Sequence, residues 1–295
     1  MKSYSISDRI LMRMSCLALF CMILLGCGTQ GEKNETKGYI KVVAHRGDWK
    51  NAPENSFMGL QNCIDMGVDM IEIDIAMTKD SVLVLMHDET LDRTTNGKGP
   101  IREWTFDALQ ALNLTLSDGT LTSEKIPTFE DFLLQSKGKI EVFIDKGYPF
   151  LEQAHSILEK TGTLNEGHFL GFVSADQFKQ DYPELHQVVN YIPLVLPSEQ
   201  VNQQLQSFEQ IGSTYYLYSF DNEDAALLST VNSISTQAFA MATTQEARYC
   251  AGHTDSLSLS DPEQGWGWVL DQGFNAICTD FPEQLISYLQ SKNLR

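Results

Sequence analysis

The chain has 295 residues, enough for one large domain or two small ones, so its length alone leaves the number of domains open. Hydrophobic residues make up 42% of it and charged residues 20%, the composition of an ordinary globular protein. Its formal net charge is −18, and so acidic a surface repels nucleic acid, which excludes a general nucleic-acid-binding protein.

The first 27 residues have the pattern of an export signal. Lys2, Arg9 and Arg13 form a basic start, the apolar stretch 11–25 is short for a membrane span, and Leu-Leu-Gly-Cys ends at Cys27. This pattern resembles a bacterial lipoprotein signal peptide over residues 1–27, cleaved before Cys27, with lipid attached to the Cys27 sulfur. A plain signal peptide and a signal anchor are the alternatives.

Residues 28–39 are polar, and we predict a flexible tether there between the lipid and a globular domain at 40–295. The mature protein is then membrane-tethered outside the cytoplasm, in the periplasm or at the cell surface. Loss of residues 1–27 leaves 18 basic and 38 acidic residues, a formal charge of −20. Such a charge argues against an enzyme that works by lying on an anionic bilayer.

Three cysteines remain in the predicted mature domain, Cys63, Cys250 and Cys278. Their number is odd, they form no Cys-x-x-Cys pair, and each has apolar neighbours. We therefore predict buried free thiols, although one disulfide is compatible with an oxidising compartment.

Strand-like and helix-like segments alternate through the globular part, which is typical of parallel strands joined by crossover helices. A helix is expected at 55–66, with Asn55 as its cap, and another after Thr128. Further helices are expected at 107–112, 150–160, 176–182, 199–211, 222–231, 261–272 and 282–291. The predicted strands are 42–45, 70–76, 139–145, 169–173, 191–196, 215–220, 238–242 and 276–278, with a hairpin strand at 81–86.

Eight such strands predict a single-domain TIM (β/α)8 barrel, and the charged motifs fall at the carboxyl ends of strands, where barrel enzymes keep their sites. An open doubly wound sheet is the main alternative. It lacks support because no Gly-x-Gly-x-x-Gly follows a strand.

Charged side chains gather at the strand ends between residues 45 and 88. Glu72 and Asp74 lie on the same face of one strand, where two carboxylates repel each other unless a cation lies between them. Carboxylate oxygens favour one divalent cation of the hard class, Ca2+ or Mg2+. His45 and His87 end two neighbouring strands and are candidates for a general acid and a general base. For either histidine alone, a hydrogen-bonded core residue is the ordinary interpretation, and for the acids a solvated strand face.

The order of these motifs closely resembles the glycerophosphodiester phosphodiesterases. The motifs are His45-Arg46-Gly47, Pro-Glu-Asn-Ser at 53–56, Glu72-Ile73-Asp74, His87-Asp88, Arg93-Thr94-Thr95 and Thr-Asp-Phe-Pro at 279–282. The resemblance implies a TIM barrel in which Glu72 and Asp74 are metal ligands, His45 and His87 are the catalytic pair, and Arg46 binds the phosphate. It leaves open which histidine is the acid.

The end of the third predicted strand departs from the family pattern. The family usually has Glu-x-Lys there, whereas this chain has Ile144-Asp145-Lys146. We predict Asp145 as the third metal ligand and Lys146 as a phosphate or oxyanion contact. Because adjacent strand residues point to opposite sides, this assignment requires a bulge at the barrel rim. The alternative is that Asp145 faces away and water completes the metal shell.

Four other polar or aromatic positions have less defined expectations. Glu54 is interpreted as a partner that fixes Arg46 or a histidine. Phe281 stands where the family has arginine. His253 and Asp255 are expected in a polar loop after the seventh strand, with a substrate-facing lid as the alternative.

The predicted activity is metal-dependent hydrolysis of a small-molecule glycerophosphodiester to glycerol 3-phosphate and an alcohol. Two alternatives stay open: a phosphoinositide- or sphingolipid-type phosphodiesterase on the same barrel, and a tethered binding lipoprotein without catalysis. A binding protein needs no acid and base, so the two histidines favour an enzyme.

Overall fold

The computed structural model describes residues 38–295. The predicted signal peptide, Cys27 and the tether up to residue 37 lie outside the described residues. Within the described part, none of the helices has the length and apolar character needed to cross a bilayer.

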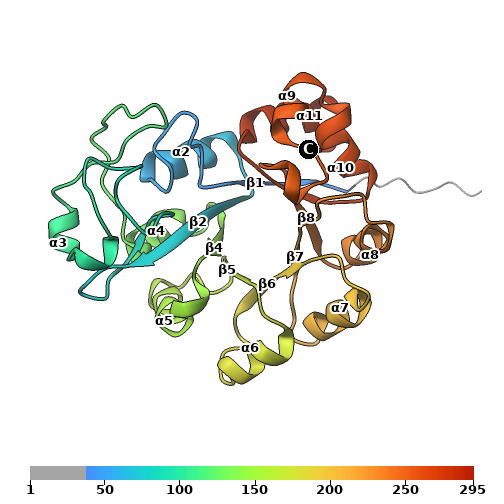
Figure 1. Ribbon diagram of the computed structural model, residues 1–295, viewed down its shortest axis with the longest axis horizontal. Coiled ribbons are helices and arrows are strands. Elements are labelled where there is room, and N and C mark those ends of the chain that lie inside the picture. Colours follow the sequence, from blue (N-terminus) through green and yellow to red (C-terminus); the bar gives the residue numbers. More distant parts are fainter. Residues whose placement is uncertain (1–37) are drawn as a thin grey trace, which may run out of the picture. The chain divides into compact units, whose positions relative to one another are not determined.

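Eight parallel strands close into a barrel, as Figure 1 shows. Its closure comes from the first strand, which pairs with both the second and the last strand. The TIM barrel prediction is therefore confirmed, and the open doubly wound sheet is excluded. The barrel strands are β1 (Lys41–Ala44), β2 (Met70–Met77), β4 (Glu141–Asp145), β5 (Gly167–Gly171), β6 (Asn190–Val195), β7 (Tyr215–Tyr218), β8 (Phe239–Thr243) and β9 (Ala276–Thr279).

A short antiparallel strand, β3 (Leu83–Leu85), extends β2 beyond the barrel as the predicted hairpin. The chain after β3 forms a lobe with its own small apolar core, which includes Val84, Leu91 and Leu114. This lobe lies at the left of Figure 1. Because the lobe follows directly from β3, it brings residues 87–95 back to the mouth of the barrel.

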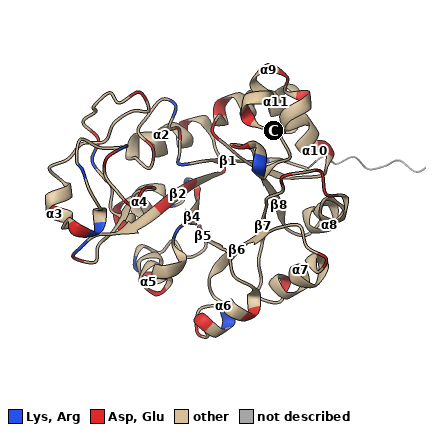
Figure 2. Cartoon of the chain, in the orientation of Figure 1, with Lys and Arg blue, Asp and Glu red and all other residues tan. Residues whose placement is uncertain are grey.

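Helices surround the barrel (Figure 1), and acidic residues are scattered over them, with few Lys and Arg (Figure 2). The helices are α2 (Phe57–Met66), α3 (Phe106–Leu109), α4 (Phe129–Ser136), α5 (Leu151–Thr161), α6 (Ala175–Asp181), α7 (Val201–Glu209), α8 (Ala225–Ser235), α9 (Asp255–Ser260), α10 (Trp268–Asp271) and α11 (Pro282–Ser291). A π-helical turn, Glu263–Gly267, precedes α10.

The expected cap of the first helix is wrong by one residue. Ser56 caps α2, because its hydroxyl accepts a hydrogen bond from the Gly59 amide. Asn55 instead adopts a left-handed conformation, with φ of 55°, and its side chain is used in the site. Thr128 caps α4 as predicted and accepts from the Asp131 amide.

Apolar side chains fill the barrel interior and also form the layer between strands and helices. Inside the barrel, Val43, Met70, Phe143, Leu217 and Met241 are among the buried residues. The three cysteines of the domain are buried and unpaired, as predicted. The filled interior means that a ligand can enter only at the strand ends.

A polar cluster closes the amino end of the barrel, opposite the end that carries His45 and His87. Glu141 is its centre: Lys41 Nζ lies 2.5 Å from one oxygen, and the Tyr215 hydroxyl donates to the other at 2.6 Å. His168 Nε2 lies 3.1 Å from that second oxygen. Burial of the carboxyl opposes ionisation, but His168, Lys41 and Tyr215 outweigh it and lower the pKa of Glu141 to about 2.

The Glu141 cluster predicts a pH-dependent contribution to stability. A carboxyl whose pKa is depressed on folding stabilises the fold above its unfolded pKa, and this contribution is lost as pH falls from 4.5 to about 2. After discounting for solvent, we expect Glu141→Gln to lower the free energy of unfolding at pH 7 by about 1–2 kcal/mol. Urea unfolding from pH 7 to 2.5 measures this. A difference between variant and wild type that does not shrink with falling pH would contradict the account.

Candidate active site

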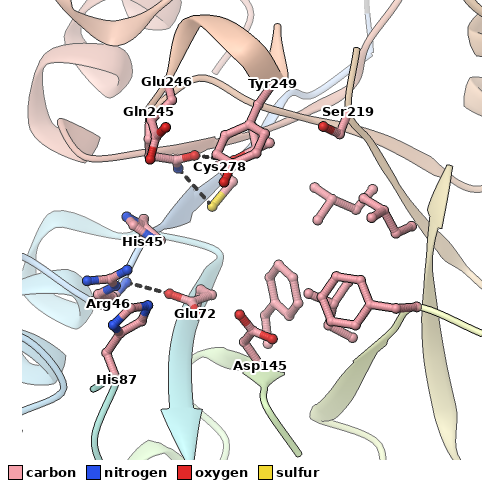
Figure 3. A pocket seen from close by; sticks show the side chains of 16 residues that line it. His45, Arg46, Glu72, His87, Asp145, Ser219, Gln245, Glu246, Tyr249 and Cys278 are labelled. Atoms are coloured by element: carbon pink, nitrogen blue, oxygen red, sulfur yellow. Dashed lines mark hydrogen bonds between the residues drawn. The ribbon is translucent and has the colours of Figure 1, made fainter. Parts of the chain in front are cut away.

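A pocket of about 230 Å³ opens at the carboxyl ends of the barrel strands. Figure 3 shows its polar wall, formed by His45, Arg46, Glu72, His87 and Asp145. The facing wall is apolar and comes mostly from later strands, and a polar rim completes the opening. The apolar wall comprises Phe143, Leu170, Phe172, Leu194 and Leu217, and the rim includes Ser219, Gln245, Glu246 and Tyr249.

Three carboxylates meet beside this pocket. Glu72 and Asp74 come from β2, and Asp145 ends β4 directly opposite Asp74 in the strand register. One oxygen from each lies within 4.8 Å of the others. Burial, together with the charges of its two acidic neighbours, raises the pKa of Glu72 well above its usual value. Burial and the charge of Asp74 likewise raise the pKa of Asp145.

The carboxylate cluster fits a divalent cation. Asp74 Oδ1 is buried and accepts no hydrogen bond from the described residues. The nearest cationic group in this part of the chain is the Lys146 ammonium at 3.4 Å, and one ammonium does not balance three carboxylates, so a divalent cation would lower the cost of the cluster. Because all three candidate ligands are oxygens, they suit Ca2+ or Mg2+.

Asp145 joins the cluster without a bulge. The ladder between β2 and β4 continues to the Asp74 and Asp145 pair, and the direction of the chain changes only afterwards. Lys146 has φ of 57°, a left-handed conformation that returns its side chain to the site. Its ammonium lies 3.4 Å from Asp74 Oδ1 and donates to the His87 carbonyl. The structure thus places Lys146 against a candidate ligand and outside the pocket lining.

Asn55 supports Asp74 and was missed by the sequence interpretation. Its amide donates to Asp74 Oδ2 at 3.0 Å, and its carbonyl oxygen accepts from the Asp74 amide at 3.0 Å. This paired contact uses both ends of the side chain, which only an amide supplies. The signal was present in the Pro-Glu-Asn-Ser motif, since asparagine tolerates the left-handed backbone better than most residues.

Arg46 contacts two of the carboxylates and also lines the pocket. Its backbone amide donates to Glu72 Oε2 at 2.7 Å, in a left-handed turn with φ of 54°. Its guanidinium lies 3.6 Å from both Glu54 and Asp74. Its Nε is buried and makes no hydrogen bond to the described residues. Arg46 therefore supplies a guanidinium to the polar wall of the pocket.

His45 is held by Asp280, a contact that the sequence interpretation did not assign. His45 Nδ1 lies 2.7 Å from Asp280 Oδ1, and the Trp49 indole donates to the same oxygen at 2.9 Å. Burial opposes ionisation of Asp280, but its contacts to His45 and Trp49 hold its pKa below the usual value. Next to it, the Phe281 ring packs under the Lys50 ammonium at 4.5 Å. Phe281 therefore takes part in an aromatic contact where the family has arginine.

His87 is held by a different carboxylate. Its Nδ1 lies 2.7 Å from Asp88, and Arg93 binds both oxygens of Asp88 at 2.8 Å. Arg93 also binds both oxygens of Glu54 at 2.6 and 2.8 Å. The Arg93 hydrogen bonds, despite partial burial, hold the pKa of Asp88 well below its usual value. Glu54 thus lies between Arg46 and Arg93 and links the two sides of the site.

The segment after β8 differs from the expected polar loop. Asp255 begins helix α9 and is 2% exposed, so it lies in the core. His253 does not line the pocket, because its ring stacks on Trp268 with centroids 3.7 Å apart. The lid alternative therefore has no support from these two residues.

A family model matches the first half of the barrel, and several curated proteins match part of the chain. Residues 45–165 match the glycerophosphoryl diester phosphodiesterase family. A glycerophosphodiester phosphodiesterase of Caldanaerobacter subterraneus is 38% identical over 122 residues, covering 38% of this chain and 49% of that protein. One from Bacillus subtilis is 33% identical over 172 residues, covering 53% and 58%.

Over residues 45–165 the chain is thus similar to the glycerophosphodiester phosphodiesterases. It spans about half the length of the curated relatives it matches. A second family model, described only as a domain of unknown function, matches residues 191–289.

Solved structures of the family share the whole fold. A glycerophosphoryl diester phosphodiesterase from Parabacteroides distasonis superposes with a TM-score of 0.71 at 22% identity, covering 87% of this chain and 88% of that one. An Oleispira antarctica phosphodiesterase, solved in complex with sn-glycerol 3-phosphate, gives 0.63 at 20% identity and covers 85% and 97%. At these identities the likeness concerns the fold.

The contact between Asn55 and Asp74 predicts weaker metal binding when the amide is removed. Asn55→Gly keeps the left-handed backbone and should reduce the affinity for the cation by about tenfold, as is typical of partners that orient ligands. Calorimetric titration of the metal-free protein with Ca2+ and Mg2+ measures this. Asn62→Ala, which removes a 2.8 Å bond to Asp48, is the control and should bind like the wild type. Equal affinities in all three proteins would contradict the role of Asn55.

Proposed function

We propose that this protein is a metal-dependent phosphodiesterase that hydrolyses glycerophosphodiesters to glycerol 3-phosphate and an alcohol. The observation that carries the proposal is the convergence of three carboxylate oxygens within 4.8 Å next to two histidines and an arginine in one pocket. Each histidine has its Nδ1 against a carboxylate. Nε2 is then the nitrogen left to exchange a proton with the substrate.

Glu72, Asp74 and Asp145 would hold the divalent cation, Ca2+ or Mg2+. Such an ion supplies Lewis-acid polarisation of a phosphoryl oxygen and orients the reacting groups. Lys146, 3.4 Å from Asp74, offsets part of the negative charge of this cluster and anchors the backbone of His87.

In the proposed reaction, Arg46 binds the phosphate through its guanidinium. One histidine removes the proton from the attacking glycerol hydroxyl or water, and the other donates a proton to the leaving alkoxide. Asp280 and Asp88 orient the two rings and stabilise the imidazolium that forms on each. Arg46 offsets the charge that grows on the phosphoryl oxygens in the transition state.

The substrate class rests on the family and on its members. The curated relatives from Caldanaerobacter subterraneus and Bacillus subtilis bear the name of this activity. The Oleispira antarctica structure of the same fold holds sn-glycerol 3-phosphate as its product. The polar wall of the pocket in this chain provides an arginine for the phosphate and a carboxylate cluster for the cation that the reaction needs.

We further propose that the protein is exported as a lipoprotein tethered through Cys27 in the periplasm or at the cell surface. The support is the sequence pattern of residues 1–27. Mass spectrometry of the mature amino terminus tests this, and an unlipidated terminus would contradict it.

The activity is tested with residues 28–295 after removal of metal by EDTA. Glycerophosphocholine, glycerophosphoethanolamine and glycerophosphoinositol are supplied with Ca2+ or Mg2+, and release of glycerol 3-phosphate is followed. We expect release that depends on the metal. Absence of product with either ion, from protein shown to be folded by circular dichroism, would overturn the proposal.

The two histidines predict a specific loss of turnover. His45→Ala and His87→Ala should each lower kcat by roughly 100-fold or more, because each removes a proton-transfer group, while the thermal unfolding temperature stays close to that of the wild type. His186→Ala is the control, since the His186 ring contacts the Pro183 carbonyl and does not line the pocket. Near-wild-type turnover in both single variants would reject the catalytic pair.

A further inference from the structure

A buried carboxylate outside the pocket, Asp255, gathers four hydrogen-bond donors. Its Oδ1 accepts from the hydroxyls of Thr244 and Thr279 at 2.6 and 2.7 Å and from the Trp266 indole at 2.9 Å. Its Oδ2 accepts from the backbone amide of Asp280 at 2.8 Å. Every donor is neutral, and Asp255 forms no ion pair within residues 38–295. Keeping a carboxylate in such a place is costly, and only a full set of donors makes it tolerable.

These contacts fix the turn that follows β9. Thr279 donates its hydroxyl to Asp255 and accepts with the same oxygen from the Phe281 amide at 3.0 Å. The Asp280 amide between them is bound by Asp255 Oδ2. The carboxylate of Asp255 therefore fixes residues 279–281 of the turn, two of them directly and Phe281 through Thr279.

The same turn carries the carboxylate that holds His45. Asp280 Oδ1 lies 2.7 Å from His45 Nδ1, and the His45 backbone amide donates to the Thr279 carbonyl at 3.0 Å. Both the backbone and the imidazole of His45 are therefore placed against this turn. A small shift of the turn changes the distance between Asp280 and the ring, on which the orientation of the ring depends.

The two histidines are supported in different ways. The carboxylate beside His87 is clamped by the guanidinium of Arg93 through two hydrogen bonds. Within residues 38–295, no guanidinium clamps Asp280, whose side chain contacts the Trp49 indole and His45. Its position depends instead on the backbone anchor that Asp255 provides.

We propose that Asp255 is a positioning residue for His45, acting through the backbone and carboxylate of Asp280. The inference rests on the proposed function, in which His45 transfers a proton. It also gives a role to the stretch that matches a domain of unknown function, because Thr244, Asp255, Trp266 and the turn all lie within residues 191–289. Residues 191–289, in the second half of the barrel, thus orient His45, which lies in the first half.

Asp255→Asn tests the proposal with almost no change in shape. The variant can keep an oxygen toward the three donors on Oδ1, but it then presents an amide N–H2 to the Asp280 N–H. Two donors face each other, so the anchor is lost while the side chain still fills its place. The expected result is a kcat about 10- to 100-fold lower with KM changed less than about threefold.

A double-variant cycle separates positioning from general destabilisation. If Asp255 acts through Asp280, adding Asp255→Asn to Asp280→Asn should lower kcat by less than about threefold further. Losses that multiply in the double variant would overturn the proposal. Glu141→Gln is the matched control, because it removes a half-buried, hydrogen-bonded carboxylate from the network at the opposite end of the barrel. It should lower stability and leave kcat per folded molecule unchanged.

A spectroscopic measurement tests the role of Asp255 independently of whether the protein has the proposed enzymatic activity. Nitrogen-15 NMR of the histidine rings, with His45 assigned from its alanine variant, reports which ring nitrogen carries the proton. The wild type should show the Nδ1–H form, and Asp255→Asn a mixture with Nε2–H. An unchanged His45 signal would overturn positioning even if the enzyme is active. Should the wild type release no product, the proposed function fails and the NMR result still decides this inference.

If Asp255→Asn does not fold, Thr244→Val provides a milder test of the same proposal. It removes one donor from Asp255 Oδ1 and keeps the shape of the side chain. We expect a kcat about 3- to 10-fold lower and a partial shift of the His45 signal. A folded Thr244→Val protein with wild-type kcat and an unchanged His45 signal would overturn the proposal.

Discussion

Repulsion among three carboxylates, two of them buried and the third half-buried, is the constraint on which the rest of the site depends. Two unit charges 4.8 Å apart repel by about 3 kcal/mol at the effective dielectric constant of a protein. Burial adds to this cost, and the raised pKa values of Glu72 and Asp145 are its direct expression. A stable fold can keep such a cluster only when cations or donors surround it.

The chain supplies these partners from turns that immediately follow strands. Arg46 and Lys146 sit in left-handed turns after β1 and β4, and Asn55 in a third left-handed position before α2. Each turn brings a donor or a cation back toward Asp74. Backbone conformations that cost energy are thus concentrated around the cluster, as is common at functional sites.

The two halves of the barrel have different tasks around this centre. The first half, which matches the phosphodiesterase family, provides the carboxylates, both histidines and Arg46. The second half provides most of the apolar wall and the turn that holds His45. Strands β1 and β9 are hydrogen-bonded neighbours. His45 and Asp280, which are 235 positions apart in the sequence, therefore lie next to each other in the fold. Closure of the barrel is therefore a condition for the geometry of the site.

The sequence was sufficient for the barrel and for most residues of the polar wall, but insufficient for their supports. The sequence predicts the alternation of strands and helices because it is a local pattern. The motifs between His45 and Asp88 are local patterns too, so they can also be recognised from the sequence alone. Asp280 and Asp255 were missed as supports because their partners lie far away in the chain. The bulge expected near Asp145 was wrong for a different reason. A left-handed residue at position 146 achieves the same result, and alternation rules do not anticipate it.

In the proposed reaction the three carboxylates bind one divalent cation on which hydrolysis depends. The most direct measurement titrates metal-free protein with Ca2+ or Mg2+ and follows binding and glycerol 3-phosphate release at the same ion concentrations. The account predicts one ion per chain, a midpoint of activation equal to the midpoint of binding, and loss of both in Asp74→Asn. Full turnover by the metal-free protein, or an ion bound equally well by Asp74→Asn, would contradict it.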